Sequence, residues 1–261
     1  MATQWKKFNN EQHQFDFSGD ALKQNWSNLH EGNLEPYPEN EQLQEAWRRY
    51  HTGDFSEAVA IGTELGQQGA VVTAFATVIY AQYMEQDSDE KIRLFKQAIT
   101  LCEKHIESTP NELNLHYMHA VAMGRYSQFI SMVEALQQGY GKKIKDALDN
   151  CLALNSSHAE ALVTCGGWNA EIVDKAGAML GKIMYGATKE QSIENYQKAL
   201  VQAPNSPVPY LEYAYGLQAM YGETKLDETI KFLEQGIAIT PTDAMQALDQ
   251  QAAKRQLGTI T

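Results

Sequence analysis

The sequence has few cysteines and no long apolar run, and each of these scarcities excludes a class of protein. The three cysteines are an odd number, and each lies in an apolar helical pattern: Cys102, Cys151 and Cys165. We therefore expect buried free thiols and a reducing compartment. No stretch approaches the roughly 20 apolar residues that cross a bilayer, and no secretory signal is visible, so we expect a cytoplasmic location.

Basic residues are also scarce, since 21 Lys and Arg stand against 33 Asp and Glu and give a formal net charge of −12. Nucleic-acid binders neutralise phosphates with Lys and Arg, so this balance argues against a nucleic-acid partner. It argues equally against an anionic membrane surface. Catalytic motifs are lacking too, because the Gly141-Lys142 pair has neither the spacing nor the preceding strand of a phosphate loop. We predict no enzymatic activity, no cofactor and no metal.

Three histidines and one glutamate have to be weighed as metal ligands. His116 and His119 are three residues apart on one predicted helix, and His158 and Glu160 open the next repeat. Zinc sites usually need three or four ligands with tighter spacing than this. Packing and capping roles are therefore favoured for these histidines.

The chain contains instead a repeated tail, in which a helical pattern ends in proline or a small polar substitute. The four tails end at Pro110, Ser156, Pro204 and Pro241, and after the first three a new apolar helical pattern begins. Residues 50–58, Tyr-His-Thr-Gly-Asp-Phe-Ser-Glu-Ala, resemble the turn of a tetratricopeptide repeat. Residues 41–241 thus resemble the tetratricopeptide superfamily. The resemblance implies an all-α, right-handed α-solenoid of about five helix-turn-helix repeats.

The expected domain layout has three parts. An N-terminal arm with a short helix occupies residues 1–40, and this arm is either flexible or docked. The repeat array occupies 41–241, and a C-terminal capping helix occupies 242–261. The predicted helix pairs are 42–51 with 55–65, 70–86 with 88–108, 112–138 with 142–154, 158–185 with 189–202, and 209–221 with 226–239.

The third and fourth repeats are longer than the standard of about 34 residues. Because their second helices keep a normal length, we predict elongated, unbroken first helices over 113–138 and 158–185. Gly177 and Gly181 lie within the second of these. They either allow close helix packing, which is favoured, or mark a helix break.

Several strings resemble narrower groups within the superfamily. Residues 119–128, 168–172, 185–187 and 243–245 are similar to an uncharacterised group of proteobacterial tetratricopeptide proteins, which implies a bacterial cytoplasm. A weaker resemblance, based on helix layout, is to regulator-of-microtubule-dynamics proteins and to the repeat proteins that accompany TRAP transporters. The missing lipoprotein signal counts against the last group.

In the superfamily, first helices line a concave groove that binds ligands. The comparable positions here give an aromatic, nearly neutral groove without the basic clamp of chaperone-binding members. The candidate partner-binding residues are Trp47, Tyr50, Tyr117, Arg125, Trp168, Glu171, Tyr215 and Gln218. Arg125 and Glu171 either form an ion pair that fixes helix stacking, which is favoured, or hold a polar ligand.

The function predicted from these observations is a non-catalytic scaffold or adaptor. It would bind a protein or peptide partner through the aromatic groove or the extended helices. The alternative is a small-molecule carrier with its site between the elongated helices of the third and fourth repeats. A homo-oligomer is a further hypothesis, with apolar self-association residues Met179, Leu180, Ile183 and Met184.

Overall fold

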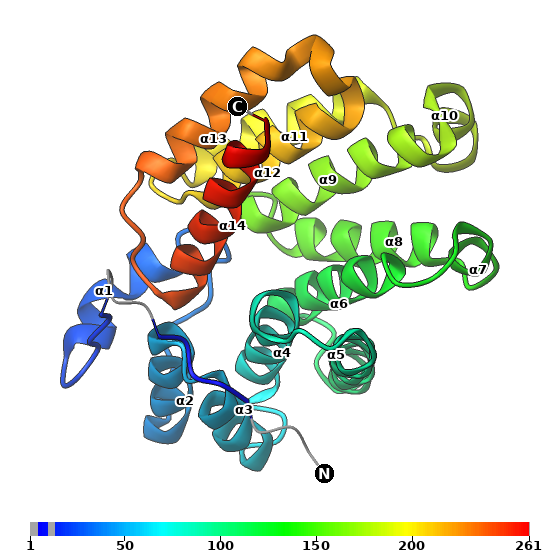
Figure 1. The fold of residues 1–261 in the computed structure, drawn as a ribbon. Helices are drawn as coiled ribbons and strands as arrows, with labels where there is room; N and C mark the ends of the chain where they lie inside the picture. Colours follow the sequence, from blue (N-terminus) through cyan, green and yellow to red (C-terminus); the bar gives the residue numbers. More distant parts are fainter. Residues whose placement is uncertain (1–4, 10–13, 261) are drawn as a thin grey trace. The chain divides into compact units, whose positions relative to one another are not determined.

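The computed structural model describes residues 5–9 and 14–260, and from Ala21 onward these form α-helices joined by short connections (Figure 1). Within these residues there is no β-strand, which confirms the all-α prediction. The helices form two compact units. Unit 1 comprises the described residues up to Leu29, then Glu35–Tyr140 and Asp243–Met245; unit 2 comprises His30–Leu34, Gly141–Thr242 and the described residues from Gln246. None of the described helices combines the length and the apolar character needed to cross a membrane.

Unit 1 contains the first two predicted helix pairs and the start of the third. From α2 to α6 each helix packs on the next in sequence, and α4 also packs on α2 and α6, so first helices contact first helices. This nearest-neighbour packing is typical of repeat arrays. The helices are α1 (Ala21–Leu29), α2 (Glu41–Thr52), α3 (Phe55–Glu64), α4 (Ala70–Ile79), α5 (Ser88–Ser108), α6 (Leu113–Ser127) and α7 (Met132–Gln137).

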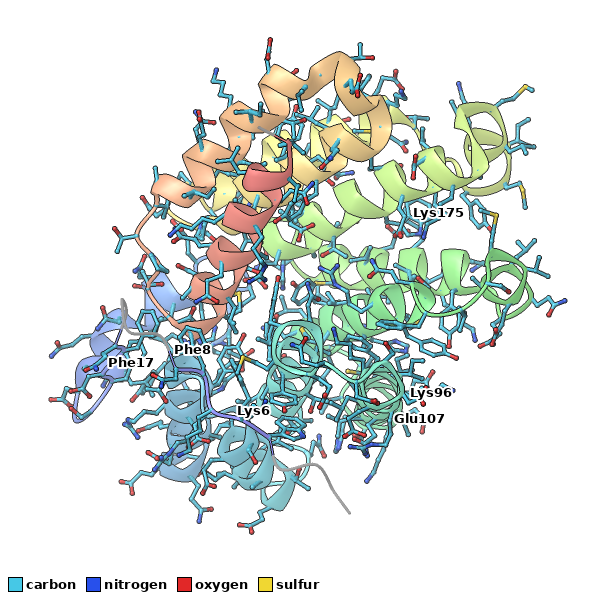
Figure 2. All side chains as sticks on the ribbon, viewed as in Figure 1. Lys6, Phe8, Phe17, Lys96, Glu107 and Lys175 are labelled. Atoms are coloured by element: carbon cyan, nitrogen blue, oxygen red, sulfur yellow. The ribbon has the colours of Figure 1, made fainter. Side chains whose placement is uncertain are left out.

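The turn between α2 and α3 shows how local chemistry sets these boundaries. The Asn40 side chain accepts hydrogen bonds from the first turn of α2, and Gly53 ends the helix with a φ of 84°. A Cβ at Gly53 would clash with Phe8, whose backbone N–H donates to the Gly53 carbonyl at 3.0 Å. Phe17, which is labelled in Figure 2, is also buried. Its ring centroid lies 5.7 Å from that of His51. The described part of the N-terminal arm is therefore docked.

An aromatic cluster forms part of the core of unit 1. Trp47 is almost completely buried and lies edge-on to Trp26 of α1, Tyr50 of α2 and Phe75 of α4, with ring centroids 5.4–5.8 Å apart. Since aromatic side chains bury large areas, this cluster fixes α1 against the first two helix pairs.

Unit 2 contains most of α8, the fourth and fifth helix pairs, and most of α14. The α11 and α12 helices pack on α9, and α13 packs on α12. The helices are α8 (Tyr140–Leu154), α9 (Ala159–Ala176), α10 (Ala178–Tyr185), α11 (Lys189–Gln202), α12 (Val208–Tyr221), α13 (Leu226–Ala238) and α14 (Ala244–Ile260).

Tyr196 of α11 is the centre of the main core of unit 2. Its ring is fully buried and is stacked on Tyr213 at 4.9 Å. Gly166 of α9 and Gly216 of α12 leave the space that this ring occupies, because a Cβ on either glycine would overlap with it. The two glycines therefore allow three helices to pack around one large side chain.

The prediction of two unbroken long helices is wrong. The first segment is divided into α6 and α7, and Ser131 caps α7 by accepting a hydrogen bond from the Glu134 N–H at 3.1 Å. The second is divided into α9 and α10 at Gly177, whose φ of 80° and ψ of 152° lie outside the helical region. The alternative that glycine marks a helix break is confirmed at Gly177. Gly181, in contrast, is buried beside Ile172.

Candidate binding surfaces

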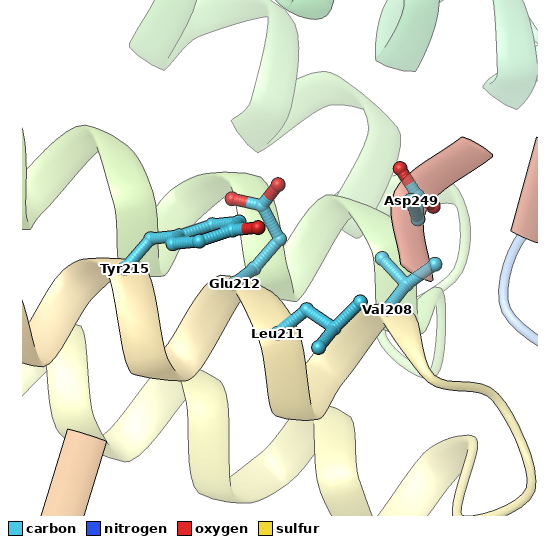
Figure 3. A pocket seen from close by; sticks show the side chains of 5 residues that line it. All are labelled: Val208, Leu211, Glu212, Tyr215 and Asp249. Carbon is cyan, nitrogen blue, oxygen red and sulfur yellow. The ribbon is translucent and has the colours of Figure 1, made fainter. Parts of the chain in front are cut away.

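A small depression lies on unit 2 where α12 meets α14. Four of its lining residues come from α12 and one from α14; they are Val208, Leu211, Glu212, Tyr215 and Asp249 (Figure 3). Its empty volume is about 180 Å³, part of which is open to solvent. Sites for drug-sized ligands measure about 300–1,000 Å³, so the depression is too small for such a ligand even with its open solvent included.

The helical period of α12 brings its four lining residues together. Positions 208, 211, 212 and 215 are three or four residues apart, so their side chains form one stripe. Leu211 is buried in a cluster with Ala214, Leu233 and Ala253, which fixes the floor of the depression. The side chain of Gln256 on α14 donates to Gln218 on α12 at 2.6 Å. This hydrogen bond and the cluster hold α14 beside α12.

The lining of the depression is acidic and aromatic. Two of the five residues, Glu212 and Asp249, carry carboxylates, and none is basic. In Figure 3 the Glu212 carboxylate and the Tyr215 ring lie on adjacent turns of α12, while Asp249 approaches from α14. The depression therefore combines a negative rim with an apolar floor and one aromatic ring.

Two of the predicted groove residues belong to this region. Tyr215 lines the depression and Gln218 lies one turn further along α12, and both are half-buried. Sequence reasoning missed Glu212 and Asp249. Glu212 is three residues before Tyr215, so the same helical stripe could have identified it. Asp249 belongs to the predicted capping helix, for which no repeat position predicts a binding role.

Three other predicted groove residues are core residues in this structure. Trp47 and Tyr50 are buried in the aromatic cluster of unit 1. Trp168 is buried in unit 2, where its Nε1–H donates to the Gly141 carbonyl at 3.0 Å and its ring lies edge-on to Tyr185. These rings stabilise the two units, and they are too buried to contact a partner without a rearrangement.

The remaining predicted groove residues are half-buried or partly exposed. Tyr117 and Arg125 are on α6, and the Tyr117 ring lies 5.9 Å from that of Phe75. Glu171 on α9 forms an ion pair with Lys175 one turn later, at 2.6 Å. The pairing of Arg125 with Glu171 stays a prediction, as does a partner-binding role for any of these residues.

The α10 helix presents an apolar face to solvent. Met179 is 71% exposed, Leu180 53%, Ile183 74% and Met184 53%, and only Gly181 of this helix is buried. Gly181 packs against Ile172, and the Tyr185 ring lies close to Gly141. The helix follows α9 directly (Figure 1). It is therefore fixed by one side, while its large apolar side chains remain uncovered.

A smaller apolar face occurs on α7 in unit 1. Met132, Val133 and Leu136 are each more than half exposed, and no residue of this six-residue helix is buried. Both α7 and α10 belong to the over-long segments of the third and fourth repeats. The extra residues of these repeats thus add exposed apolar surface rather than core.

The histidines considered as metal ligands have structural roles. His158 accepts a hydrogen bond from the Ala161 N–H at 3.0 Å and so caps α9; burial lowers its pKa to about 4, which keeps the ring neutral. His116 lies 2.8 Å from the Pro110 carbonyl, and His119 lies 3.5 Å from the Glu103 carboxylate. Among the described residues, no group of three or more His, Cys, Asp or Glu is placed to hold a metal ion.

A family model described as regulator of microtubule dynamics protein 1-3 matches residues 43–259. The chain belongs to this family. The match runs from α2 to α14, so it includes all five helix pairs and the terminal helix. Among the resemblances read from the sequence, the one to regulator-of-microtubule-dynamics proteins is thereby confirmed, although helix layout alone supported it there. The proteobacterial group stays a prediction.

Solved structures support the fold of this family member. The crystal structure of a thermophilic tetratricopeptide-repeat protein from Thermus thermophilus is similar with a TM-score of 0.58 and 14% identity. The similarity covers 82% of this chain and 97% of that one. It confirms the tetratricopeptide-like helical repeat. A comparison with curated proteins finds no match.

Proposed function

We propose that this chain is a non-catalytic scaffold that binds protein partners, and that the apolar face of α10 is one of its contact surfaces. The chain is a tetratricopeptide-like repeat protein of the regulator-of-microtubule-dynamics family, and such arrays typically provide protein-interaction surfaces. The observation that supports α10 most directly is the exposure of its four large apolar side chains.

Physical chemistry favours a protein occupant for this face. Removing apolar surface from water contributes about 25 cal/mol per Å², and contiguous exposed patches of a few hundred Å² often mark interaction sites. The packing of Gly181 on Ile172 holds the helix in place, so little order has to be gained on binding. A partner surface that presents apolar side chains would therefore fit the apolar face of α10.

We propose a second copy of this chain as that partner. Two copies of one apolar face can meet across a two-fold axis, where each removes the other from water. A standard interface buries about 800 Å² per partner, which four side chains do not supply alone. Self-association through α10 is therefore expected to be weak and to depend on protein concentration.

Sedimentation velocity over a range of concentrations tests this proposal. The wild-type chain should show an average sedimentation coefficient that rises with concentration, and Ile183→Asp should remove most of the rise. Val201→Asp is a matched control, because Val201 is 76% exposed against 74% for Ile183 but lies on α11. A wild-type chain that stays monomeric at all concentrations, or an equal effect of both variants, would refute self-association through α10.

The alternative of a small-molecule carrier with its site between the elongated first helices of the third and fourth repeats stays a hypothesis, and the depression on unit 2 lies elsewhere, on α12 and α14. Its volume of about 180 Å³ is below the usual range for such sites, and its lining is charged. A protein-binding role remains the proposed function.

A further inference from the structure

Residues 5–8 of the N-terminal arm lie across the start of the repeat array. In Figure 1 this segment passes α2 and α3 without forming a helix. The Trp5 ring is stacked on the Tyr80 ring, with the centroids 4.0 Å apart and the planes 4° from parallel. The Lys6 backbone N–H donates to the Tyr80 hydroxyl oxygen at 3.4 Å. One end of the segment therefore uses both the face and the hydroxyl of this tyrosine.

The other end of the segment lies on the turn between α2 and α3. The Phe8 backbone N–H donates to the Gly53 carbonyl at 3.0 Å, and a Cβ at Gly53 would lie 2.4 Å from the Phe8 Cβ. Glycine thus leaves the room that this side chain occupies. Between the two aromatic residues, the Lys7 ammonium lies 2.6 Å from the Asp54 carboxylate. The surface made by Gly53, Asp54 and Tyr80, which we name the arm site, contacts an aromatic ring, a positive charge and a second aromatic side chain in this order.

The contacts that hold the segment are few and partly exposed. The Lys7 side chain is 71% exposed, and an ion pair at such exposure contributes little to stability. Trp5 and Phe8 are only half-buried, whereas Tyr80 and Asp54 beneath them are buried. A segment with so few contacts opens far more readily than the packed helices that it covers. A partner segment with the same order of side chains can therefore compete for the arm site.

We infer that the arm site binds a short segment of a partner protein in place of the chain's own residues 5–8. The partner segment carries two aromatic residues, with a basic residue directly before the second of them. Its first ring stacks on Tyr80, its basic side chain pairs with Asp54, and its second aromatic side chain lies on Gly53. The chain's own segment then competes within the molecule and lowers the apparent affinity. The inference rests on the proposed scaffold function and deepens it, because it specifies the chemistry of a partner.

Titration of the full-length chain with a capped copy of the segment tests this inference. The probe is acetyl-Trp-Lys-Lys-Phe-Asn-amide, the control probe is acetyl-Ala-Lys-Lys-Ala-Asn-amide, and the amide chemical shifts of Gly53, Asp54 and Tyr80 are the readout. The Trp5→Ala/Phe8→Ala chain, whose own segment is weakened, should bind the probe with a dissociation constant of about 0.1–1 mM. The wild-type chain should bind it at least about fivefold more weakly, because its own segment competes. The control probe should not saturate the arm site.

Charge variants assign the binding to the arm site. Lys7→Glu reverses the charge that faces Asp54 without removing a ring, so this chain should bind the probe at least about twofold more tightly than the wild type does. Asp54→Asn, added to the Trp5→Ala/Phe8→Ala chain, should weaken binding about two- to fivefold. Glu64→Gln in the same chain is the matched control, since Glu64 is an exposed carboxylate on α3, and it should leave binding unchanged. Circular dichroism confirms that each variant is folded.

Four results would overturn the inference. They are no saturable binding of the probe to the Trp5→Ala/Phe8→Ala chain, equal binding of the probe to this chain and to the wild type, equal binding of the two probes, and an equal effect of Asp54→Asn and Glu64→Gln. Ile183→Asp, added to the same chain, should leave probe binding unchanged. Loss of self-association with retained probe binding, or the reverse, therefore separates the failure of one proposal from the failure of the other.

Discussion

Alanine substitutions at two neighbouring glycines of α9 should change stability in different ways. An alanine Cβ at Gly166 would lie 2.8 Å from two ring carbons of Tyr196, which is shorter than real side chains tolerate. At Gly167 the nearest atom would be the Tyr196 hydroxyl oxygen at 3.6 Å, an ordinary van der Waals distance. The pair thus compares the same substitution, in the same helix, with and without overpacking.

The magnitude follows from two terms. Replacing a helix-interior glycine by alanine contributes about 0.8–1 kcal/mol of stability, and this gain applies at both positions. Overpacking a core costs about 1–3 kcal/mol, and it applies only at Gly166. Tyr196 has no room to retreat, because its ring is fully buried and already touches Gly216. The Gly167→Ala chain should therefore be more stable than the Gly166→Ala chain by about 1–3 kcal/mol.

Urea unfolding followed by far-ultraviolet circular dichroism measures this difference directly. Gly167→Ala should raise the free energy of unfolding by about 0.5–1 kcal/mol, and Gly166→Ala should leave it unchanged or lower it by up to about 2 kcal/mol. Adding Tyr196→Phe should not rescue Gly166→Ala, because the closest atoms to the new methyl are ring carbons rather than the hydroxyl. Equal stability of the two alanine variants would refute this account of the packing around Tyr196.

Three further predictions concern buried ionisable groups. Burial, reinforced by Glu112 and opposed by a hydrogen bond from Asn114, raises the pKa of Glu35 from its ordinary 4.5 to about 8. Between these two pH values the folded chain keeps a proton on Glu35 that the unfolded chain releases. The free energy of unfolding of the wild type, relative to Glu35→Gln, should therefore fall by up to a few kcal/mol as the pH rises through this window. A difference that does not depend on pH would contradict this. Asp243→Asn should lower the free energy of unfolding, measured in urea, by about 1–3 kcal/mol, because it weakens the buried contact of 2.8 Å between this carboxylate and His51. Unchanged stability would show that the carboxylate charge of Asp243 is dispensable. Burial raises the pKa of the thiols of Cys102, Cys151 and Cys165 to about 12. Ellman's reagent at pH 8 should therefore react with them only after the chain unfolds. Rapid reaction of the native chain would contradict the structure.

The helix pairs could be predicted from the sequence because their boundaries depend on local chemistry. Gly53 adopts the left-handed conformation that its place in the turn implied, and Pro204 follows the end of α11. The start of the second pair is helical, as predicted for residues 70–86, and α4 continues into one turn of π-helix over Tyr80–Met84. Such signals act over a few residues, so a single sequence contains them.

Helix continuity was harder to predict, although one signal was present. Ser131 and Glu134 have the spacing of a capping box, which marks the start of α7 and so the end of the preceding helix. Gly177 was ambiguous, because glycine can either pack closely inside a helix or leave it at positive φ without strain. The length of a repeat shows how many extra residues it has. It does not show whether those residues continue the first helix or form a second one.

The groove residues were only partly predictable, because their assignment assumed that nothing outside the repeats covers them. Trp47 is covered by Trp26 of α1, which precedes the array, and Trp168 is covered by Tyr185 of α10, which lies in an over-long segment. Tyr215, which is half-buried, lines the depression on α12. Positions taken from the repeat alone therefore do not predict which side chains are exposed where other segments pack over them, and a partner-binding role for the remaining residues stays a prediction.

The same reasoning explains why α10 calls for a functional interpretation. A repeat needs one buried face on each helix to stack on its neighbours, and in α10 this contact comes from Gly181 and the partly buried Tyr185. The four large apolar residues of the helix add nothing to that packing, since each is more than half exposed. Side chains that fold the chain are buried by the chain itself, whereas these require a second surface to leave water. This exposure is the observation on which the proposed contact surface of α10 depends.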